Sequence, residues 1–398
     1  MRIGIDCLTV NPDYKGGINT YLFGLINGFA KIGLKYNYII FCTSKNKGVF
    51  EKYIESEKIN LVIIDNYKPI FRKLLLGVAY ALNSLLLWRS IQNMFTSLTG
   101  MTKLVESKCD ILYTATTTLN FYNLKIPTIL SMHDIQQYHY PEFFTKHKLR
   151  TRRLSFENSA KCATYFQASS QFIKNDLLVH FPFLKEEQIV VIPEGVEIEE
   201  FSNASHIDII KKYNLPAEFL FFPAQLWKHK NHITVLKSLK QIEEKNKIKI
   251  PLVLTGAKSS SFNEVVNYIE RNNMDYIYYL GIVEFPDLLA LYKKAKFLIT
   301  AVLYESSSLP ILEAVASSTA IIASKTPPNI EMSKSIQMSL FEPLDVDKCS
   351  ETIKERWLTD KIIINKEIDN NCKNISSYSW ENIAKKYLNF VEEKIDVK

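Results

Sequence analysis

The chain has 398 residues, of which 47% are hydrophobic and 23% are charged. This length exceeds the size at which a single hydrophobic core usually stops growing, so we expect two domains. The composition excludes a low-complexity or disordered protein. A net charge of +7 favours anionic partners, but the charge is too diffuse to indicate nucleic acid, which we do not expect as a partner.

The cysteine pattern indicates a compartment. The six cysteines are scattered, with no CxxC pair and no metal-ligand spacing. Reduced, packed thiols are the best interpretation of this pattern, and they favour the cytoplasm. Residues 1–6 have the pattern of a strand and not that of an export signal. We therefore expect a cytoplasmic protein.

Short apolar runs alternate with helix-length segments along the chain. The first set predicts strands at 2–6, 38–42, 60–64, 111–114, 128–132, 165–169 and 190–193. The second set predicts strands at 219–223, 252–256, 276–280, 297–301, 320–323 and 339–341. Helical segments such as 17–32 and 171–181 separate the strands, which favours parallel pairing through right-handed crossovers.

The two sets of strands predict an α/β protein with two Rossmann-like, doubly wound parallel-sheet domains. We place the first domain at 1–200 and the second at 201–376. A helical stripe at 380–395 predicts that residues 377–398 form a C-terminal helix that crosses back to the first domain. Ligands of such sheets bind outside the carboxyl ends of the strands, so we expect the function in a central cleft that both domains face.

The run 304–314 has the most informative local pattern, because it joins the strand at 297–301 to a helical stretch through a serine-rich loop. Pro310 suits the start of a helix. The backbone N–H groups of this loop and the positive end of the helix dipole would form an anion site, suitable for a diphosphate.

Two carboxylates bracket this anion site. Glu305 lies in the loop, and we expect Glu313 in the first helical turn. Both could accept hydrogen bonds from sugar hydroxyls, one from the transferred sugar and the other from a ribose. The alternative is that Glu313 only complements the helix N-terminus and that Glu305 is a solvated loop charge.

The run 304–314 resembles the Glu-Gly-Phe-Gly-Leu-Pro-x-x-Glu signature of the retaining glycosyltransferases of family four, which have the GT-B fold. Other segments are similar to this family in the expected order along nearly the whole chain. They are the glycine loop 16–18 with Tyr21, the histidine-bearing segment 131–134, the connection 192–196, the donor loop 223–232, Gly281 with 288–292, and the turn 341–345.

The resemblance implies functions for single positions. The catalytic residues would be His133 beside the transferred sugar, Lys230 on the diphosphate, and Glu305. The donor-binding set would be Gly16, Gly17, Gln225, Lys230, Ser306, Ser307, Ser308, Leu309 and Glu313. His133 could instead be an ordinary packed or capping residue at a strand end.

We expect no metal at the reacting centre and no cofactor beyond a nucleotide-diphosphate sugar as co-substrate. The segment 345–347 has the sequence Asp-Val-Asp, which matches the metal-binding pattern DxD. It follows Pro343, however, and precedes a helical pattern. Helix capping is therefore the expected role of Asp345.

The implied activity is retaining transfer of a hexose or deoxyhexose from a nucleotide-diphosphate sugar to a glycan acceptor. The sequences of segments 133–136, 140–144 and 223–232 are similar to those of bacterial mannosyl- and rhamnosyltransferases of surface polysaccharide assembly. This resemblance implies a role in lipopolysaccharide, O-antigen or capsule biosynthesis. An NAD-dependent oxidoreductase is disfavoured because no Gly-x-Gly-x-x-Gly follows the first strand.

The sequence also departs from the family pattern. Gln225 stands where many members carry an arginine, and Ser306 and Ser308 replace the usual glycines, which matters if any loop position needs a positive φ. The alternative to an active transferase is therefore a catalytically silent protein that binds a nucleotide sugar.

The apolar segment 74–88 is too short to span a membrane. It could be a core helix of the first domain. It could instead be an interfacial helix that, with the basic run 146–153, docks on an anionic membrane surface carrying a lipid-linked acceptor. In the second case the protein would be peripheral at the inner face of the cytoplasmic membrane.

Overall fold

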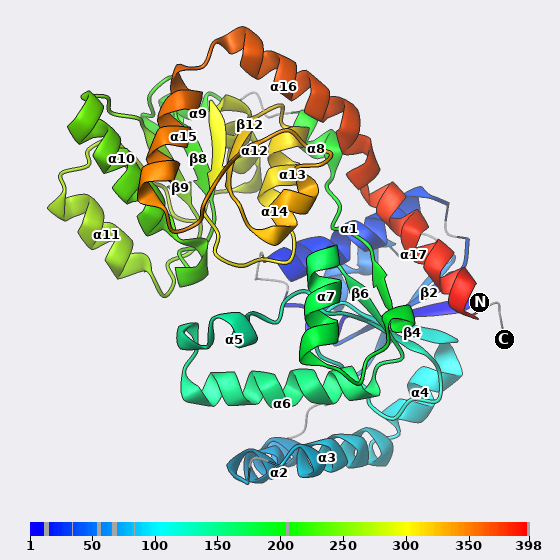
Figure 1. Ribbon diagram of the computed structural model, residues 1–398. Coiled ribbons are helices and arrows are strands. Elements are labelled where there is room, and N and C mark those ends of the chain that lie inside the picture. The colour runs from blue at the N-terminus through cyan, green and yellow to red at the C-terminus, as the bar shows by residue number, and fades with distance from the viewer. Residues whose placement is uncertain are drawn as a thin grey trace. The chain divides into compact units, whose positions relative to one another are not determined.

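The computed structural model describes residues 1–11, 16–33, 35–53, 57–65, 70–82, 84–203 and 207–395. The chain divides into two compact units (Figure 1). The first contains Met1–Pro193 and Ile383–Lys398, and the second contains Glu194–Asn382. All six cysteines are free thiols.

The first unit is built on a seven-stranded sheet in the order β3-β2-β1-β4-β5-β6-β7, with every pair parallel. Its strands are β1 (Arg2–Asp6), β2 (Asn37–Cys42), β3 (Ile59–Ile63), β4 (Ile111–Thr114), β5 (Thr128–Ser131), β6 (Tyr165–Ala168) and β7 (Ile189–Val191). Its helices are α1 (Gly17–Lys31), α2 (Ile70–Ala81), α3 (Leu85–Leu98), α4 (Met101–Lys108), α5 (Gln136–His139), α6 (Lys146–Cys162) and α7 (Gln171–His180).

The second unit is built on a six-stranded parallel sheet in the order β10-β9-β8-β11-β12-β13. Its strands are β8 (Leu220–Pro223), β9 (Leu252–Thr255), β10 (Ile277–Tyr279), β11 (Phe297–Thr300), β12 (Ala320–Ser324) and β13 (Ser339–Phe341). Its helices are α8 (Ile198–Ser202), α9 (Ile209–Tyr213), α10 (His232–Asn246), α11 (Phe262–Arg271), α12 (Phe285–Lys294), α13 (Leu309–Ala316), α14 (Pro327–Met332), α15 (Val346–Leu358) and α16 (Lys361–Asn374).

Successive residues of the central strands face opposite sides of the second sheet, as the pleat requires. Phe221 packs into one core with Ile311 of α13, while Leu220 and Phe222 pack into a second core with Val235 of α10. Both faces are therefore covered by helices (Figure 1). This double burial explains why the strands are nearly continuous apolar runs.

The sequence prediction of fold class is confirmed. Each predicted strand is present to within two residues at either end, and the two sheets are wholly parallel. The last helix, α17, spans Trp380–Ile395, the range of the helical stripe in the sequence. From Ile383 onward its residues belong to the first unit, where Tyr387 Oη lies 2.5 Å from Tyr21 Oη and 3.2 Å from Tyr113 Oη.

The expectation of a single helix at 74–88 is wrong, because the segment forms the end of α2 and the start of α3, which lie side by side (Figure 1). Ser84 begins α3 as a capping residue, since its Oγ accepts from the backbone N–H of Leu87 at 3.2 Å. A serine in this position offers the backbone an alternative to a continuous helix. Asn83 lies outside the described residues.

The α2–α3 pair has two unlike faces. One face forms a small core in which Ala79, Trp88 and Ile91 pack with Leu154 of α6. Other side chains of the pair are exposed, with 65% of Leu74, 66% of Leu82 and 79% of Leu86 open to solvent. The pair is therefore neither wholly buried in the core nor wholly exposed. Within the described ranges, every helix falls short of the length and apolar content needed to cross a bilayer.

Candidate functional site

The loop between β11 and α13 carries most of the predicted donor-binding residues. None of residues 304–309 has a positive φ, so the serines in place of glycines adopt this loop without left-handed strain. Ser308 precedes α13 and is fully buried, yet its Oγ has no hydrogen-bond partner and does not cap the helix. The side chain of Ser306 is also buried, whereas Ser307 and Leu309 are partly exposed.

Lys230 and Glu305 form an ion pair, with Nζ 3.2 Å from Oε2. Only 21% of the lysine side chain and 8% of the glutamate side chain are exposed. The second oxygen of the glutamate, Oε1, is buried and has no hydrogen-bond partner. An unsatisfied buried acceptor is costly, and such groups occur where a ligand or water completes the site. The structure therefore brings together two of the predicted catalytic residues and leaves an acceptor open beside them.

Asn231 fixes the position of Lys230. It has φ of 57°, in the left-handed region that asparagine tolerates better than most residues. Its side-chain amide donates to the carbonyl of Ala301 at 3.1 Å and to the carbonyl of Pro343 at 2.7 Å. The donor loop is thereby tied to the loops that follow β11 and β13. Sequence reasoning gave Asn231 no role, although an asparagine directly after the lysine was a usable signal.

Gly256, at the end of β9, allows close approach to the same donor loop. A Cβ on Gly256 would lie 2.6 Å from the carbonyl carbon of Ala224 and 2.7 Å from the backbone nitrogen of Gln225. The residue also has φ of +120°, a backbone angle that residues with a side chain rarely adopt. The sequence analysis placed Gly256 in a strand and missed this role.

Gln225 lies in the donor loop and accepts a hydrogen bond from Trp227 Nε1 at 3.0 Å. The two histidines of the loop add no positive charge, because burial, followed by the charge of Lys230, lowers the pKa of both His229 and His232 to about 3. The cationic charge of this loop therefore comes from Lys228, which is exposed, and from Lys230.

Glu313 is placed differently from the prediction. It is the fifth residue of α13 and lies beyond the first turn, because the helix begins at Leu309 and Pro310 occupies its second position. Its Oε2 accepts from Tyr292 Oη at 2.5 Å. Burial raises the pKa of Glu313 to about 6, although the Tyr292 hydrogen bond opposes that rise. The carboxylate is therefore held by α12 and ready to accept a further hydrogen bond.

A third carboxyl group, that of Glu194, belongs to the connection 192–196 and was not among the predicted site residues. Glu194 is 7% exposed, and the charges of Glu305, Lys230 and Glu313 act on it. Burial and the charge of Glu305 raise the pKa of Glu194 to about 8, against the opposing effect of Lys230. Glu194 is thus a neutral acid at pH 7, able to donate a hydrogen bond. A glutamate between Pro193 and Gly195, directly after an apolar strand, was the available signal.

The remaining predicted residues belong to the first unit. His133, at the end of β5, is buried, and its Nε2 lies 2.8 Å from the carbonyl of Ala115. Since a carbonyl only accepts, Nε2 carries the proton. Burial lowers the pKa of His133, so the ring is neutral. The ring of Tyr21 packs edge-on against it, with centroids 4.8 Å apart.

The glycine pair lies at the start of α1. Gly16 precedes the helix with extended φ and no side-chain cap, and Gly17 is exposed. A Cβ on Gly17 would meet nothing within 4 Å. Residues 12–15, which lead into this turn, lie outside the described residues.

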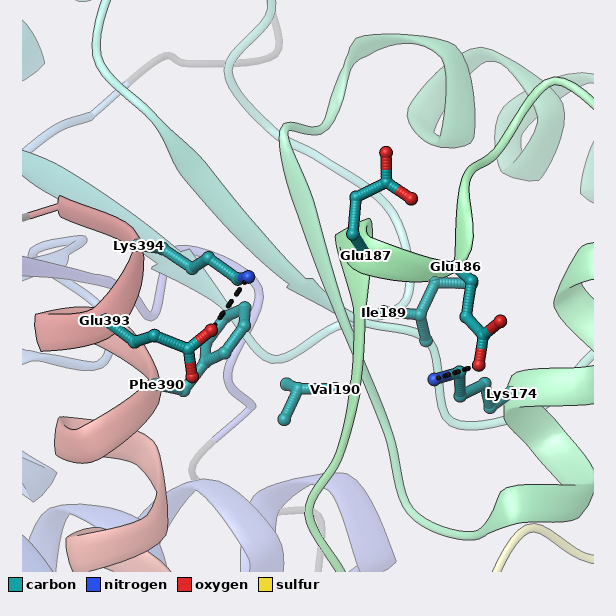
Figure 2. Close-up of a pocket in the computed structure, with 8 residues that line it drawn as sticks. All are labelled: Lys174, Glu186, Glu187, Ile189, Val190, Phe390, Glu393 and Lys394. Atoms are coloured by element: carbon teal, nitrogen blue, oxygen red, sulfur yellow. Dashed lines mark ion pairs between the residues drawn. The ribbon is translucent and has the colours of Figure 1, made fainter. Parts of the chain in front are cut away.

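Asp345 has the predicted capping role, because its side chain accepts from the backbone N–H of Lys348 at the start of α15. A pocket of about 400 Å³ lies elsewhere, beside β7 and α17 in the first unit (Figure 2). It is lined by paired charges, such as Lys174 with Glu186, and by Phe390. None of the predicted site residues lines it.

Two family models match the chain. The model described as Glycosyltransferase Family 4 matches residues 15–200, and the model described as Glycosyl transferases group 1 matches residues 206–377. Between them they cover most of both units.

Curated relatives are bacterial mannosyltransferases. The chain is 24% identical over 267 residues to O-antigen chain mannosyltransferase B of Escherichia coli, which is 66% of this chain and 69% of that protein. It is 25% identical over 198 residues to O-antigen chain mannosyltransferase RfbU of Salmonella typhimurium. That match covers 50% of this chain and 52% of the relative.

Solved structures share the fold. A glycosyltransferase from Rickettsia africae superimposes with a TM-score of 0.70 at 17% identity, covering 98% of both chains. The Anabaena protein HepE in complex with UDP and glucose superimposes with a TM-score of 0.70 at 15% identity, covering 99% of this chain and 100% of that one. Such low identities establish the GT-B fold alone.

We predict that Gly256→Ala destabilises the second unit by at least about 2 kcal/mol, because it combines backbone strain with a clash against Ala224. Gly281→Ala is the matched control, since Gly281 also has a positive φ of 70° but open space around its Cβ position. The control should lose only about 1 kcal/mol. Urea unfolding measures both losses. Equal losses would mean that the contact with Ala224 has no energetic weight.

A second prediction concerns pH. The pKa of Glu194 is about 8 in the folded chain and near 4.5 in an ordinary environment. Between these values the folded state binds more protons, so stability falls as pH rises, by up to about 1.4 kcal/mol per pH unit. Glu194→Gln removes this titration, so the fall in urea midpoint from about pH 5 to about pH 8 should become shallower. The exposed Glu264→Gln is the control, and an unchanged slope in Glu194→Gln would contradict the assignment.

Proposed function

Since this chain belongs to the group 1 and family 4 glycosyltransferases, we propose that it moves a hexose or deoxyhexose from a nucleotide-diphosphate sugar to a glycan acceptor. One observation carries the proposal. Lys230 and Glu305 form a buried ion pair beside the start of α13, and Oε1 of the glutamate is left without a partner. A nucleotide sugar has both anionic and hydroxyl groups. Its phosphates could pair with the Lys230 ammonium, and one of its hydroxyls could donate to Oε1 of Glu305.

Stabilisation of the leaving group is the main catalytic device in this proposal. Lys230 and the backbone N–H groups of 306–309 would neutralise charge that develops on the departing diphosphate, a preorganised electrostatic effect that often supplies the largest catalytic term. Asn231 and Gly256 position the lysine before substrate arrives, so the reaction itself requires little reorganisation of the loop.

The carboxyl groups would orient the donor. Glu305 would accept from the transferred sugar and Glu313 from the ribose, while the neutral Glu194 could donate to an oxygen of the donor. In the transfer step the bond between the anomeric carbon and the diphosphate oxygen breaks, and a bond to the acceptor oxygen forms. Following the family resemblance, the acceptor would attack from the leaving-group face, which retains the anomeric configuration. It would pass its proton to a phosphate oxygen of the donor. His133, neutral and buried, would contact the sugar and not act as a nucleophile.

The substrate class rests on the relatives. Both curated relatives are named as O-antigen chain mannosyltransferases, which favours a mannose- or rhamnose-type donor and a glycan acceptor of lipopolysaccharide, O-antigen or capsule assembly. No cofactor beyond the nucleotide sugar and no catalytic metal enter this mechanism. Free cysteines throughout the chain favour the cytoplasm.

The exposed apolar face of α2 and α3 supports a peripheral position at the inner face of the cytoplasmic membrane. Basic residues of α6 lie beside this pair, where Arg150 stacks 4.6 Å from the ring centroid of Tyr80 and Lys146 and Lys148 are exposed. Apolar side chains next to cationic ones are the pattern that binds anionic lipid surfaces. The acceptor could then be lipid-linked.

The alternative is a catalytically silent protein that binds a nucleotide sugar. Gln225 favours it, because an amide bonded to Trp227 occupies the position at which many family members carry an arginine. Binding without turnover would distinguish this alternative.

Lys230→Ala should lower kcat by about 100-fold or more, because it removes a charge partner of the transition state. Donor binding should fall less. Lys228→Ala, which removes an exposed cation of the same loop, is the control and should retain most activity. Gln225→Arg should be tolerated or activating, since it adds a bidentate donor for the diphosphate. Near-normal turnover by Lys230→Ala would show that other residues hold the phosphates.

Replacing the exposed Leu74 and Leu86 by glutamate should release the protein from vesicles that contain anionic lipid, and should leave its fold intact. Ile362→Glu in α16, where the side chain is 78% exposed, is the matched control and should leave binding unchanged. Vesicle flotation and circular dichroism give the two readouts. Equal flotation of all three proteins would exclude the α2–α3 face as the membrane contact.

A further inference from the structure

Three potential metal ligands converge in the first unit, apart from the residues assigned to sugar transfer. Asp176 and His180 lie four residues apart in α7, a spacing that puts both side chains on one face of a helix. His139, the last residue of α5, completes the group. Its Nε2 lies 2.7 Å and 2.9 Å from the two oxygens of Asp176, and His180 Nε2 lies 3.4 Å from the nearer one. One ligand atom from each residue lies within 4.8 Å of the other two.

We propose that His139, Asp176 and His180 bind a zinc ion. Two imidazole nitrogens and one carboxylate oxygen are a ligand set that zinc accepts, with metal–ligand distances of about 2.0 to 2.2 Å. Tetrahedral ligands at that radius lie about 3.3 to 3.6 Å from one another. The 3.4 Å between His180 Nε2 and Asp176 is in that range, and the 2.7 Å and 2.9 Å between His139 Nε2 and Asp176 are shorter. Small side-chain rotations are enough to admit the ion. The imidazoles disfavour magnesium and calcium, which prefer oxygen ligands.

The environment of the cluster favours a bound cation. Asp176 is 7% exposed, and a buried carboxylate is stable only with a positive or hydrogen-bonding partner. His180 is placed to serve as a ligand, because its Nε2 lies 3.4 Å from an oxygen of Asp176. Its ring is also held in place, stacked on Tyr138 with centroids 4.5 Å apart. Outside the three ligands, the Arg153 guanidinium lies 5.5 Å from the Tyr138 ring centroid, and the charge of Glu157 also acts on Tyr138.

The proton balance of binding is simple. In the metal-free cluster, His139 Nε2 carries the proton that it shares with the two oxygens of Asp176, since a carboxylate only accepts. Zinc replaces this proton, which moves to Nδ1 if the ring is neutral or leaves to solvent if the ring is charged. Three protein ligands leave a fourth position for water.

The ion would act as a clamp between α5 and the last turn of α7. The segment that follows β5 carries His133 and Asp134 immediately before α5, so the clamp would fix the end of that segment. Asp134 in this segment also forms an ion pair with Arg152, at 2.7 Å. His139 and Asp176 are 37 residues apart in the chain, so no local spacing in the sequence marks this cluster.

The test uses the full-length protein after dialysis against a chelator, with zinc chloride as the probe. Equilibrium dialysis with elemental analysis should give about one zinc per chain, and thermal unfolding should shift upward with zinc. His139→Gln, the mildest change because the side chain is partly exposed, should weaken zinc binding at least about tenfold, and His139→Gln with His180→Gln should abolish it. The control is His147→Gln in α6, a histidine outside the cluster, with Cys372→Ser to cover the exposed thiol.

The variants and controls distinguish binding at this cluster from binding elsewhere on the chain. Zinc bound by wild type and by both controls, and lost in the double variant, supports the site. The proposal is overturned if wild type keeps no zinc after dialysis, if the double variant binds as wild type does, or if Cys372→Ser abolishes binding. Circular dichroism of the metal-free variants shows whether they are folded, and the weaker binding expected of His139→Gln alone tests the site if the double variant does not fold.

Discussion

The second unit is organised around one constraint, the desolvation of the Lys230–Glu305 ion pair. Two charges taken out of water are stable only when geometry and further hydrogen bonds compensate for the lost hydration. The pair satisfies this in part, because Nζ is 3.2 Å from Oε2 while Oε1 stays unpartnered. A neutral Glu194 close to the pair limits the negative charge in the site. The site is thus charged, preorganised and incomplete, as expected of a protein that binds a polar ligand.

The fold supplies this arrangement from several separate loops. Lys230 comes from the loop after β8 and Glu305 from the loop after β11, both at the carboxyl ends of neighbouring parallel strands. Parallel sheets place such loops side by side, which is why ligands bind at this edge. Asn231 ties the loops together, and Gly256 lets β9 end against the backbone of the donor loop. Precision therefore depends on backbone contacts as much as on the charged groups.

Apolar runs of three to five residues predicted the strands well, because strands buried on both faces need little else. The capping of α15 by Asp345 was also predicted from the sequence. The break between α2 and α3 was not predicted, although Asn83 and Ser84 are the two polar residues of the run 74–88 and Ser84 caps α3. Roles that depend on three-dimensional proximity were missed as well. Burial gives Glu194 its altered pKa, an approaching loop makes Gly256 necessary, and the tertiary fold brings His139 to α7.

The central claim is that this chain transfers a sugar. The most direct measurement is to incubate it with a panel of nucleotide sugars and a bacterial surface-glycan acceptor, and to follow released nucleotide and the mass of the acceptor. The account predicts that one nucleotide sugar, of mannose or rhamnose type, releases its nucleotide while the acceptor gains the mass of one sugar. Binding of a nucleotide sugar with no nucleotide release and no change in acceptor mass, across the whole panel, would contradict it.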